Sequence, residues 1–171
     1  MKQRILILLL SVFLFSCSSN PDLPVVEKVD IGKYMGTWYE IAALPITAKK
    51  KCSCNKIDFE LADDNSYIRI IESCIKKEKQ GAILGKAFVD ESSGNAKWEV
   101  EHFWPFTDEL FIIALADDYS WCMTGNPNRK ELSIYSRKST LADSLYNDLV
   151  KQASDLNFDT SRIVKVVHNC N

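Results

Sequence analysis

Short β-rich runs follow one another along most of the chain, and clusters of turn-forming residues separate them. Asp, Asn, Ser, Gly and Pro mark turns at residues 63–65, 91–95, 117–118 and 125–128. Short strands with such regular turns predict an all-β sandwich or an antiparallel up-and-down barrel, and the tight consecutive hairpins favour the eight-stranded barrel. We expect its strands near residues 37–43, 54–61, 67–75, 82–90, 96–103, 109–116, 119–124 and 131–137.

Alternation is clearest at residues 97–104, where Trp98, Val100, His102 and Trp104 share one face and charged residues take the other. This pattern is typical of a strand with one dry and one wet side. Residues 109–115 are apolar on both faces. We therefore expect a helix to cover that strand from outside.

A candidate for the covering helix follows the eighth strand. Leu141, Leu145, Leu149 and Ala153 recur every four residues, and Thr140 is positioned to cap the first turn. A last strand is expected at about 162–168. The pattern thus predicts a barrel, one C-terminal α-helix packed outside it, and a short ninth strand.

The first residues indicate export. Lys2 and Arg4 precede an apolar run at 5–15, which is too short to span a bilayer, and Ser16 and Cys17 follow it. Residues 14–17 resemble a bacterial lipobox, in which the cysteine carries the lipid anchor. An ordinary secretory signal is the alternative. We expect a signal peptide at 1–16, a lipid-anchored flexible tether at 17–30 and the barrel domain at 31–171, held at the outer membrane of a Gram-negative bacterium.

Composition narrows the function classes. Removal of residues 1–16 leaves 155 residues with 19 basic and 23 acidic side chains, a net charge of about −4, which speaks against nucleic-acid binding. The mature chain has the size of one domain. Six cysteines in an exported chain indicate disulfides, and at least one thiol stays unpaired if Cys17 is the anchor.

Three short motifs carry a family resemblance. They are the run Gly36-Thr37-Trp38-Tyr39-Glu40-Ile41-Ala42, the turn Asp117-Asp118-Tyr119, and Ser136-Arg137 at the end of the eighth strand. In this order and at these spacings the chain resembles the lipocalins, most closely the bacterial outer-membrane lipoprotein lipocalins and apolipoprotein D. The resemblance covers nearly the whole mature chain.

The resemblance implies a binding protein. It implies a guanidinium of Arg137 stacked over Trp38 at the narrow end of the barrel, with Gly36, Asp118 and Tyr119 as further structural positions. It also implies a cavity for a small hydrophobic ligand, a fatty acid or lysophospholipid, in storage, transport or membrane maintenance. The alternation at 97–104 marks which positions face inward, and the family's strand assignments extend this to the other strands. On this basis we expect the cavity to be lined by Phe88, Trp98, Val100, His102, Phe111, Ile113, Trp121 and Tyr135.

The resemblance also bears on the cysteines. It implies a disulfide between Cys54 and Cys170, and antiparallel pairing of the second and third strands brings Cys52 and Cys54 near Cys74, which favours Cys52–Cys74 as a second pair. Cys122 is left as a buried thiol. If Trp121 and Met123 face inward, Cys122, which lies between them, faces outward.

Several alternatives stay open. The sequence shows no Gly-x-Ser-x-Gly, no phosphate loop and no His pair at metal spacing, so we expect no enzyme activity, no cofactor and no metal site. A lipocalin-like isomerase or hydrolase using Cys122 or His102 is one alternative. Others are a pigment, haem or siderophore ligand and a self-filled structural barrel. The chain is expected to be a monomer or homodimer.

Overall fold

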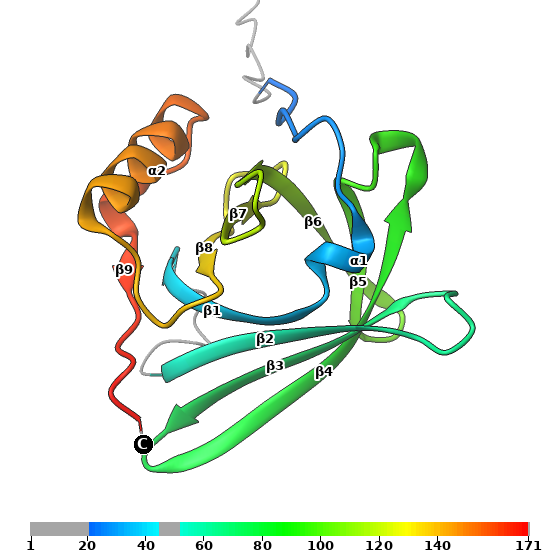
Figure 1. Cartoon of the computed structure of the whole chain (residues 1–171), viewed down its shortest axis with the longest axis horizontal. Coiled ribbons are helices and arrows are strands. Elements are labelled where there is room, and N and C mark those ends of the chain that lie inside the picture. The colour runs from blue at the N-terminus through cyan, green and yellow to red at the C-terminus, as the bar shows by residue number, and fades with distance from the viewer. Residues whose placement is uncertain (1–20, 45–51, 171) are drawn as a thin grey trace, which may run out of the picture.

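The protein is an antiparallel barrel with one long helix beside it (Figure 1). The computed structural model describes residues 21–44 and 52–170, so the expected signal peptide and Cys17 lie outside the described residues. The elements, in chain order, are α1 (Ile31–Tyr34), β1 (Gly36–Ala43), β2 (Ser53–Leu61), β3 (Ile68–Lys76), β4 (Lys79–Asp90), η2 (Glu91–Ser93), β5 (Lys97–Phe103), β6 (Phe106–Leu115), β7 (Trp121–Gly125), β8 (Leu132–Ser136), α2 (Asp143–Asp155), η3 (Thr160–Arg162) and β9 (Val164–Lys165).

The strands form an up-and-down meander that closes on itself. Neighbouring strands follow the order β2-β3-β4-β5-β6-β7-β8-β1-β9, and β1 also pairs with β2, which closes the barrel of eight strands. Every pairing is antiparallel. The predicted fold is confirmed, and the ninth strand is the short pair of residues that adds to β1.

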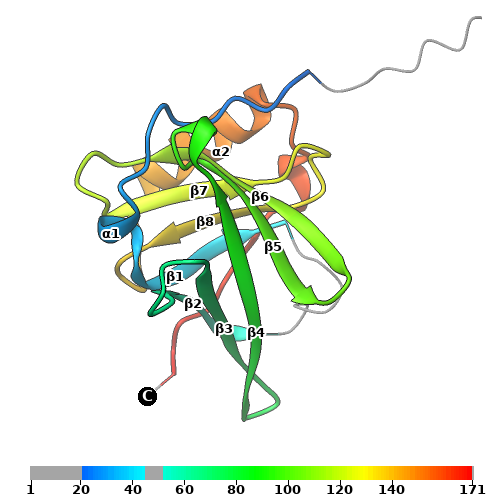
Figure 2. The ribbon, with the colours of Figure 1, turned by 90° about the vertical axis from the view of Figure 1, so that its right-hand side faces the viewer.

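Two apolar clusters lie on the two sides of the sheet. The inner cluster includes Trp38, Ile57, Phe59, Ile70 and Trp98. The outer cluster joins buried residues of β6, β7 and β8 to Leu149 and Ala153 of α2. Figure 2 shows α2 beyond these strands, outside the barrel. Both faces of β6 are therefore apolar for the reason expected from the sequence: a helix covers its outer face.

Aromatic side chains fill the end of the barrel that α1 crosses. Tyr34 lies 5.1 Å from Trp38, 5.4 Å from Phe59 and 5.2 Å from Trp98, measured between ring centroids. The Arg137 guanidinium lies 3.8 Å from the centre of the Trp38 ring, as predicted. This end is closed, and any ligand has to enter from the other end.

The N-terminal segment differs from the prediction. Residues 21–30 were expected to form a flexible tether, but Leu23 and Val29 are buried and the Val26 amide donates to the Ile112 carbonyl at 3.0 Å. The tether prediction is wrong for this part of the chain, because its few apolar residues are spaced so that they pack along the barrel.

The start of α2 also differs. Ala142 occupies the N-cap and no side chain caps the helix, so the predicted Thr140 cap is wrong. The helix instead depends on the packing of its apolar face. Among the described residues, no helix has the length and apolar character needed to cross a membrane.

Candidate ligand-binding cavity

A cavity of about 940 Å³ opens at the end of the barrel opposite α1. Its apolar wall includes Ile57 of β2, Ile83 of β4 and Phe103 of β5. A smaller hollow of about 80 Å³, lined by Ile70 and Val100 among others, adjoins it. The total volume is typical of a site for one small ligand. The barrel is therefore not filled by its own side chains, which contradicts the alternative of a self-filled structural barrel.

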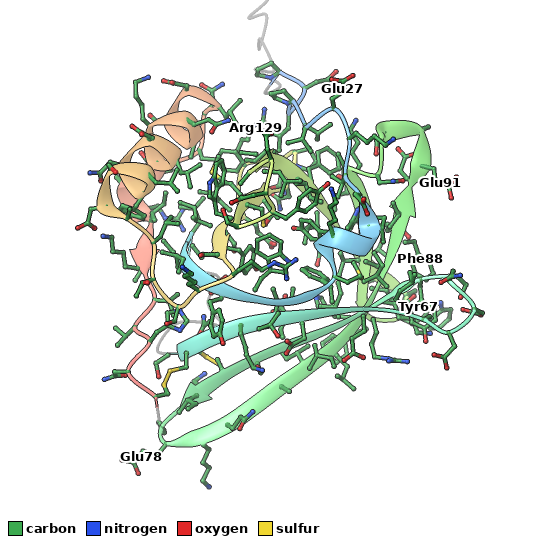
Figure 3. All side chains as sticks on the ribbon, viewed as in Figure 1. Glu27, Tyr67, Glu78, Phe88, Glu91 and Arg129 are labelled. Atoms are coloured by element: carbon green, nitrogen blue, oxygen red, sulfur yellow. A yellow bond between two sulfur atoms is a disulfide. The ribbon has the colours of Figure 1, made fainter. Side chains whose placement is uncertain are left out.

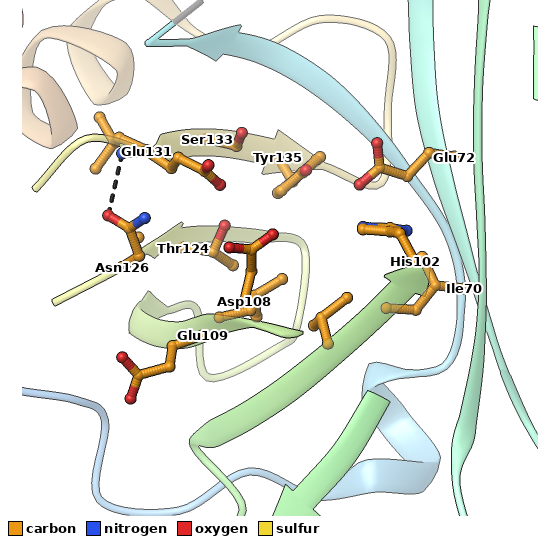
Figure 4. A pocket seen from close by; sticks show the side chains of 14 residues that line it. Ile70, Glu72, His102, Asp108, Glu109, Thr124, Asn126, Glu131, Ser133 and Tyr135 are labelled. Atoms are coloured by element: carbon orange, nitrogen blue, oxygen red, sulfur yellow. Dashed lines mark hydrogen bonds between the residues drawn. The ribbon is translucent and has the colours of Figure 1, made fainter. Parts of the chain in front are cut away.

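Polar side chains join the two hollows. Both are lined by Glu72, His102, Asp108, Glu131 and Tyr135, which come from five different strands or turns. Figure 4 shows Glu72, His102 and Tyr135 around a common space. Burial raises the pKa of Tyr135 well above its ordinary value, with a further contribution from nearby carboxylates. Its hydroxyl therefore stays protonated above the pH at which an exposed tyrosine ionises.

A buried carboxylate lies in the same wall. Glu40 of β1 is 3% exposed, and it accepts hydrogen bonds from Asn55 Nδ2 at 2.6 Å and from Ser133 Oγ at 2.9 Å. These donors fix the carboxylate and offset part of the cost of burying it. The Oδ1 atom of Asn55 is buried and has no hydrogen-bond partner. Glu40 thus gives the wall acceptor oxygens that are held in place.

His102 is held against the neighbouring strand. A Cβ atom at Gly85 would lie 2.7 Å from its Nδ1 atom, so the absence of a side chain at Gly85 makes room for the imidazole. This Nδ1 atom is buried and has no hydrogen-bond partner. The ring supplies a polar group to the cavity wall, on the face that His102 shares with Val100. Trp104 lies 82% exposed in the turn after β5, so its expected place on that face is wrong.

Lysines surround the mouth. Lys76, Lys77 and Lys79, at the turn between β3 and β4, line the cavity together with Gln80. The rim therefore carries lysines on the β3–β4 turn and the exposed carboxylates of Asp108 and Glu131 on other strands, with apolar residues further inside.

Four of the eight predicted lining residues face the interior. Val100, His102 and Tyr135 line the cavity. Trp98 also points inward, but it is 1% exposed and packs among the aromatic residues of the closed end. A tryptophan in that position belongs to the core of the domain, so we expect its removal to destabilise the fold by about 3–5 kcal/mol.

The other four predicted lining residues face outward. Phe111, Ile113 and Trp121 belong to or pack against the outer cluster under α2. Phe88 lies beside Tyr67 at the outer surface (Figure 3), with ring centroids 6.4 Å apart. Their assignment to the cavity is wrong.

Strand pairing gives the reason for these errors. Directly opposed residues share a face of the sheet. Trp98 pairs with Leu110, so Leu110 faces inward and its neighbour Phe111 faces outward. In the same way Cys122 pairs with the inward Tyr135, which turns Trp121 outward.

Cys122 consequently faces the interior, and its predicted outward orientation is wrong. The thiol is buried in the inner cluster, 3.3 Å from the Tyr34 hydroxyl. Burial raises the pKa of Cys122 to about 12 from an ordinary value of 9.0. Since the thiolate is the nucleophilic form, this environment opposes nucleophilic chemistry.

Both predicted disulfides are present. Cys52 bonds to Cys74, and Cys54 bonds to Cys170 across 116 residues. The second bond joins the start of β2 to the C-terminal segment. Cys122 is the free cysteine of the described residues.

Sequence reasoning missed several wall residues. Ile57 and Ile70 alternate with more exposed positions in β2 and β3, and this alternation was a usable signal. The carboxylate of Glu40 had no such signal, because its position depends on Asn55 and Ser133 from two other strands. Within residues 21–44 and 52–170, no group of three or more His, Cys, Asp or Glu side chains could hold a metal ion.

Comparisons with known proteins agree with this geometry. A model of the lipocalin-like domain matches residues 29–168. The chain is 28% identical over 162 residues to the outer membrane lipoprotein Blc of Escherichia coli, covering 91% of each chain. It is 31% identical over 106 residues to apolipoprotein D of Bos taurus, covering 61% of this chain and 54% of that protein.

Solved structures show the same fold. Insecticyanin from the tobacco hornworm Manduca sexta superposes with a TM-score of 0.69 at 16% identity, covering 87% of this chain and 86% of that one. At this identity the likeness supports the architecture alone. The matched domain model spans the barrel, the helix and the short last strand, and the chain belongs to the lipocalin-like family.

Proposed function

We propose that the protein binds a single-chain lipid, a fatty acid or a lysophospholipid, in the barrel cavity while Cys17 anchors it to the outer membrane. The observation that carries the binding proposal is the open cavity of about 940 Å³ with Ile57, Ile83 and Phe103 in its wall. The proposed activity is binding, for storage, transport or maintenance of membrane lipid. We propose no catalysis, since the buried thiol of Cys122 is held protonated.

The apolar wall supplies the binding energy for an acyl chain. Each methylene group transferred from water contributes about 0.8 kcal/mol, so burial of about ten methylenes contributes about 8 kcal/mol against the costs of association. The aromatic residues of the closed end leave one direction of entry. The chain is therefore expected to enter through the mouth with its polar group last.

The charges favour this orientation. A ligand carboxylate or phosphate placed deep in the barrel would face the buried Glu40 side chain, whose oxygens are acceptors and offer no donor to an anionic group. At the mouth it can instead reach Lys77 and Lys79 on the β3–β4 turn, on a rim that also holds the exposed Asp108 and Glu131. The structure thus favours a ligand with an anionic or zwitterionic head group and one acyl chain.

The test is a calorimetric titration of the delipidated protein with lysophosphatidylcholine and with palmitate. We expect saturable binding at micromolar ligand or below. Ile83→Trp fills part of the large cavity, which Ile83 lines, and is expected to weaken binding about tenfold or more, equivalent to about 1.4 kcal/mol. Val164→Trp is the matched control, because Val164 lies 54% exposed on β9, outside the cavity. Absence of saturable binding to either ligand would contradict the proposal.

The anchoring proposal has its own support. The residues before Cys17 resemble a lipobox, and the similar Escherichia coli protein is named an outer membrane lipoprotein. We expect Cys17→Ser to give a soluble or uncleaved protein whose barrel still folds, because the other cysteines lie in the folded domain. Fractionation and mass spectrometry measure this. Normal processing of Cys17→Ser, with extraction only by detergent, would refute the anchor.

A further inference from the structure

Three aromatic side chains lie exposed together at the turn between β5 and β6. Phe103 is 71% exposed, Trp104 82% and Phe106 76%, and Pro105 completes the turn. Single exposed apolar residues are common, whereas several large ones side by side indicate a surface that contacts something else. We call residues 103–106 the aromatic tip.

The aromatic tip lies at the mouth of the cavity. Phe103 lines the opening together with Lys77 and Lys79 of the turn between β3 and β4, and these lysines are exposed. Glu78 at the same turn is exposed as well, and Figure 3 shows it at the tip of that hairpin. Aromatic rings beside lysines are the combination that proteins place at the interface between bilayer and water.

The position of the N-terminal segment gives an independent argument for the same partner. Arg129 Nη2 donates to the Pro21 carbonyl at 2.7 Å, so the described chain begins beside the turn between β7 and β8. Glu131 in that turn lines the cavity, which places the turn at the mouth. From there the segment runs along the barrel to α1 at the closed end, and Figure 2 shows both ends of this path.

The distance from the anchor is short. Cys17 precedes Pro21 by four residues, which span at most about 14 Å when fully extended. If Cys17 carries the lipid, as proposed above, the mouth lies close to the membrane that holds the protein. The closed end lies on the far side.

We propose that the mouth of the barrel docks on the phospholipid bilayer, with the aromatic tip inserted among the head groups, so that a lipid passes directly between bilayer and cavity. This inference rests on the proposed anchoring for its orientation and deepens the proposed binding. The lysines of the β3–β4 turn, on the same rim, then face the phosphate groups of that surface. Lipid thus reaches the cavity without crossing water.

Quenching of tryptophan fluorescence by brominated lipid tests this contact. Of the four tryptophans, Trp104 is the exposed one, while Trp38 and Trp98 are buried and Trp121 is half-buried against the outer cluster. The detergent-purified protein is reconstituted with vesicles of brominated phosphatidylcholine, and sedimentation is measured in parallel. We expect co-sedimentation and quenching, and Trp104→Phe should remove the quenched emission.

Two further variants keep Trp104 as the reporter. The double variant Phe103→Ser with Phe106→Ser should lower the ratio of docked to undocked protein by about tenfold. Leu61→Ser is the matched control, because Leu61 is 41% exposed at the end of β2 and pairs with Ile68 at the closed end of the barrel, away from the mouth. Its quenching should equal that of the unmodified chain.

Each other outcome has a defined meaning. Co-sedimentation without quenching of Trp104 overturns the docking and leaves the anchor intact. Emission of Trp104 that changes with protein concentration instead of brominated lipid also overturns it, since the tip then joins two copies of the chain. Failure of both sedimentation and quenching contradicts docking and anchoring together. The titration with lysophosphatidylcholine reports separately on the cavity.

Discussion

Replacement of Arg137 by methionine removes the side-chain contacts that join the end of β8 to the closed end of the barrel. The guanidinium stacks on Trp38 and donates to four backbone carbonyls. These are Thr37 at 2.9 Å, Lys33 at 2.7 Å, Tyr34 at 3.1 Å and Tyr119 at 3.4 Å. These contacts join β8 to β1 and to α1. Methionine keeps an unbranched apolar side chain of similar length and removes the charge and the donors.

The contacts set the expected magnitude. Stacking of a guanidinium on an indole contributes about 0.5–2 kcal/mol, according to how far it is desolvated. Hydrogen bonds that involve a charged group contribute about 1.5–3 kcal/mol each when buried. Arg137 is only half-buried, so water can replace part of its hydrogen bonding. We therefore expect Arg137→Met to lower the free energy of unfolding by about 2–4 kcal/mol.

Urea unfolding at neutral pH, with the disulfides intact and tryptophan fluorescence as the signal, measures this loss. Arg137→Lys is the control, since it keeps the positive charge but lacks the planar fork that reaches several carbonyls, and its stability should lie between the two. Lipid binding, measured where the variant is fully folded, should be unchanged, because the cavity opens at the other end of the barrel. A loss below about 1 kcal/mol for Arg137→Met, or full stability of Arg137→Lys, would refute the reasoning.

Two further predictions concern the cysteines. Loss of the Cys54–Cys170 bond, which spans 116 residues, should lower the free energy of unfolding by about 5 kcal/mol in the chain-entropy model. Loss of Cys52–Cys74, which spans 22 residues, should lower it by about 3 kcal/mol. Equal urea midpoints for the two variants in which both cysteines of one bond are replaced by serine would contradict this order. The Cys122 thiol, whose pKa burial raises to about 12, should resist iodoacetamide at pH 9 until the chain is unfolded. The free energy of unfolding should also fall as the pH rises above 9.0, the ordinary pKa of the Cys122 thiol, because this thiol ionises first in the unfolded chain. Cys122→Ala should lessen this fall.

Local sequence patterns were sufficient for the elements of this fold. The turn clusters separate eight strands, and the four-residue spacing from Leu141 to Ala153 marks the helix, because both features depend on neighbours within a few residues. The stacking of Arg137 on Trp38 and the bond between Cys54 and Cys170 also followed, but through the family resemblance of the motifs around them. Half of the expected lining residues had the correct orientation, which Val100 and Tyr135 illustrate.

The sequence by itself determined that the chain forms strands in a closed meander with a helix outside, since periodicity and turn residues are local properties. Only the tertiary structure decided which face of β6 and β7 lines the cavity. Both faces of β6 are apolar, so alternation distinguishes two faces without saying which is inside, and a register change of one residue exchanges them. The pairing of Trp98 with Leu110 and of Cys122 with Tyr135 settles that choice. Glu40 likewise became part of the site only when β2 and β8 brought Asn55 and Ser133 to it, because contacts between distant strands leave no local pattern.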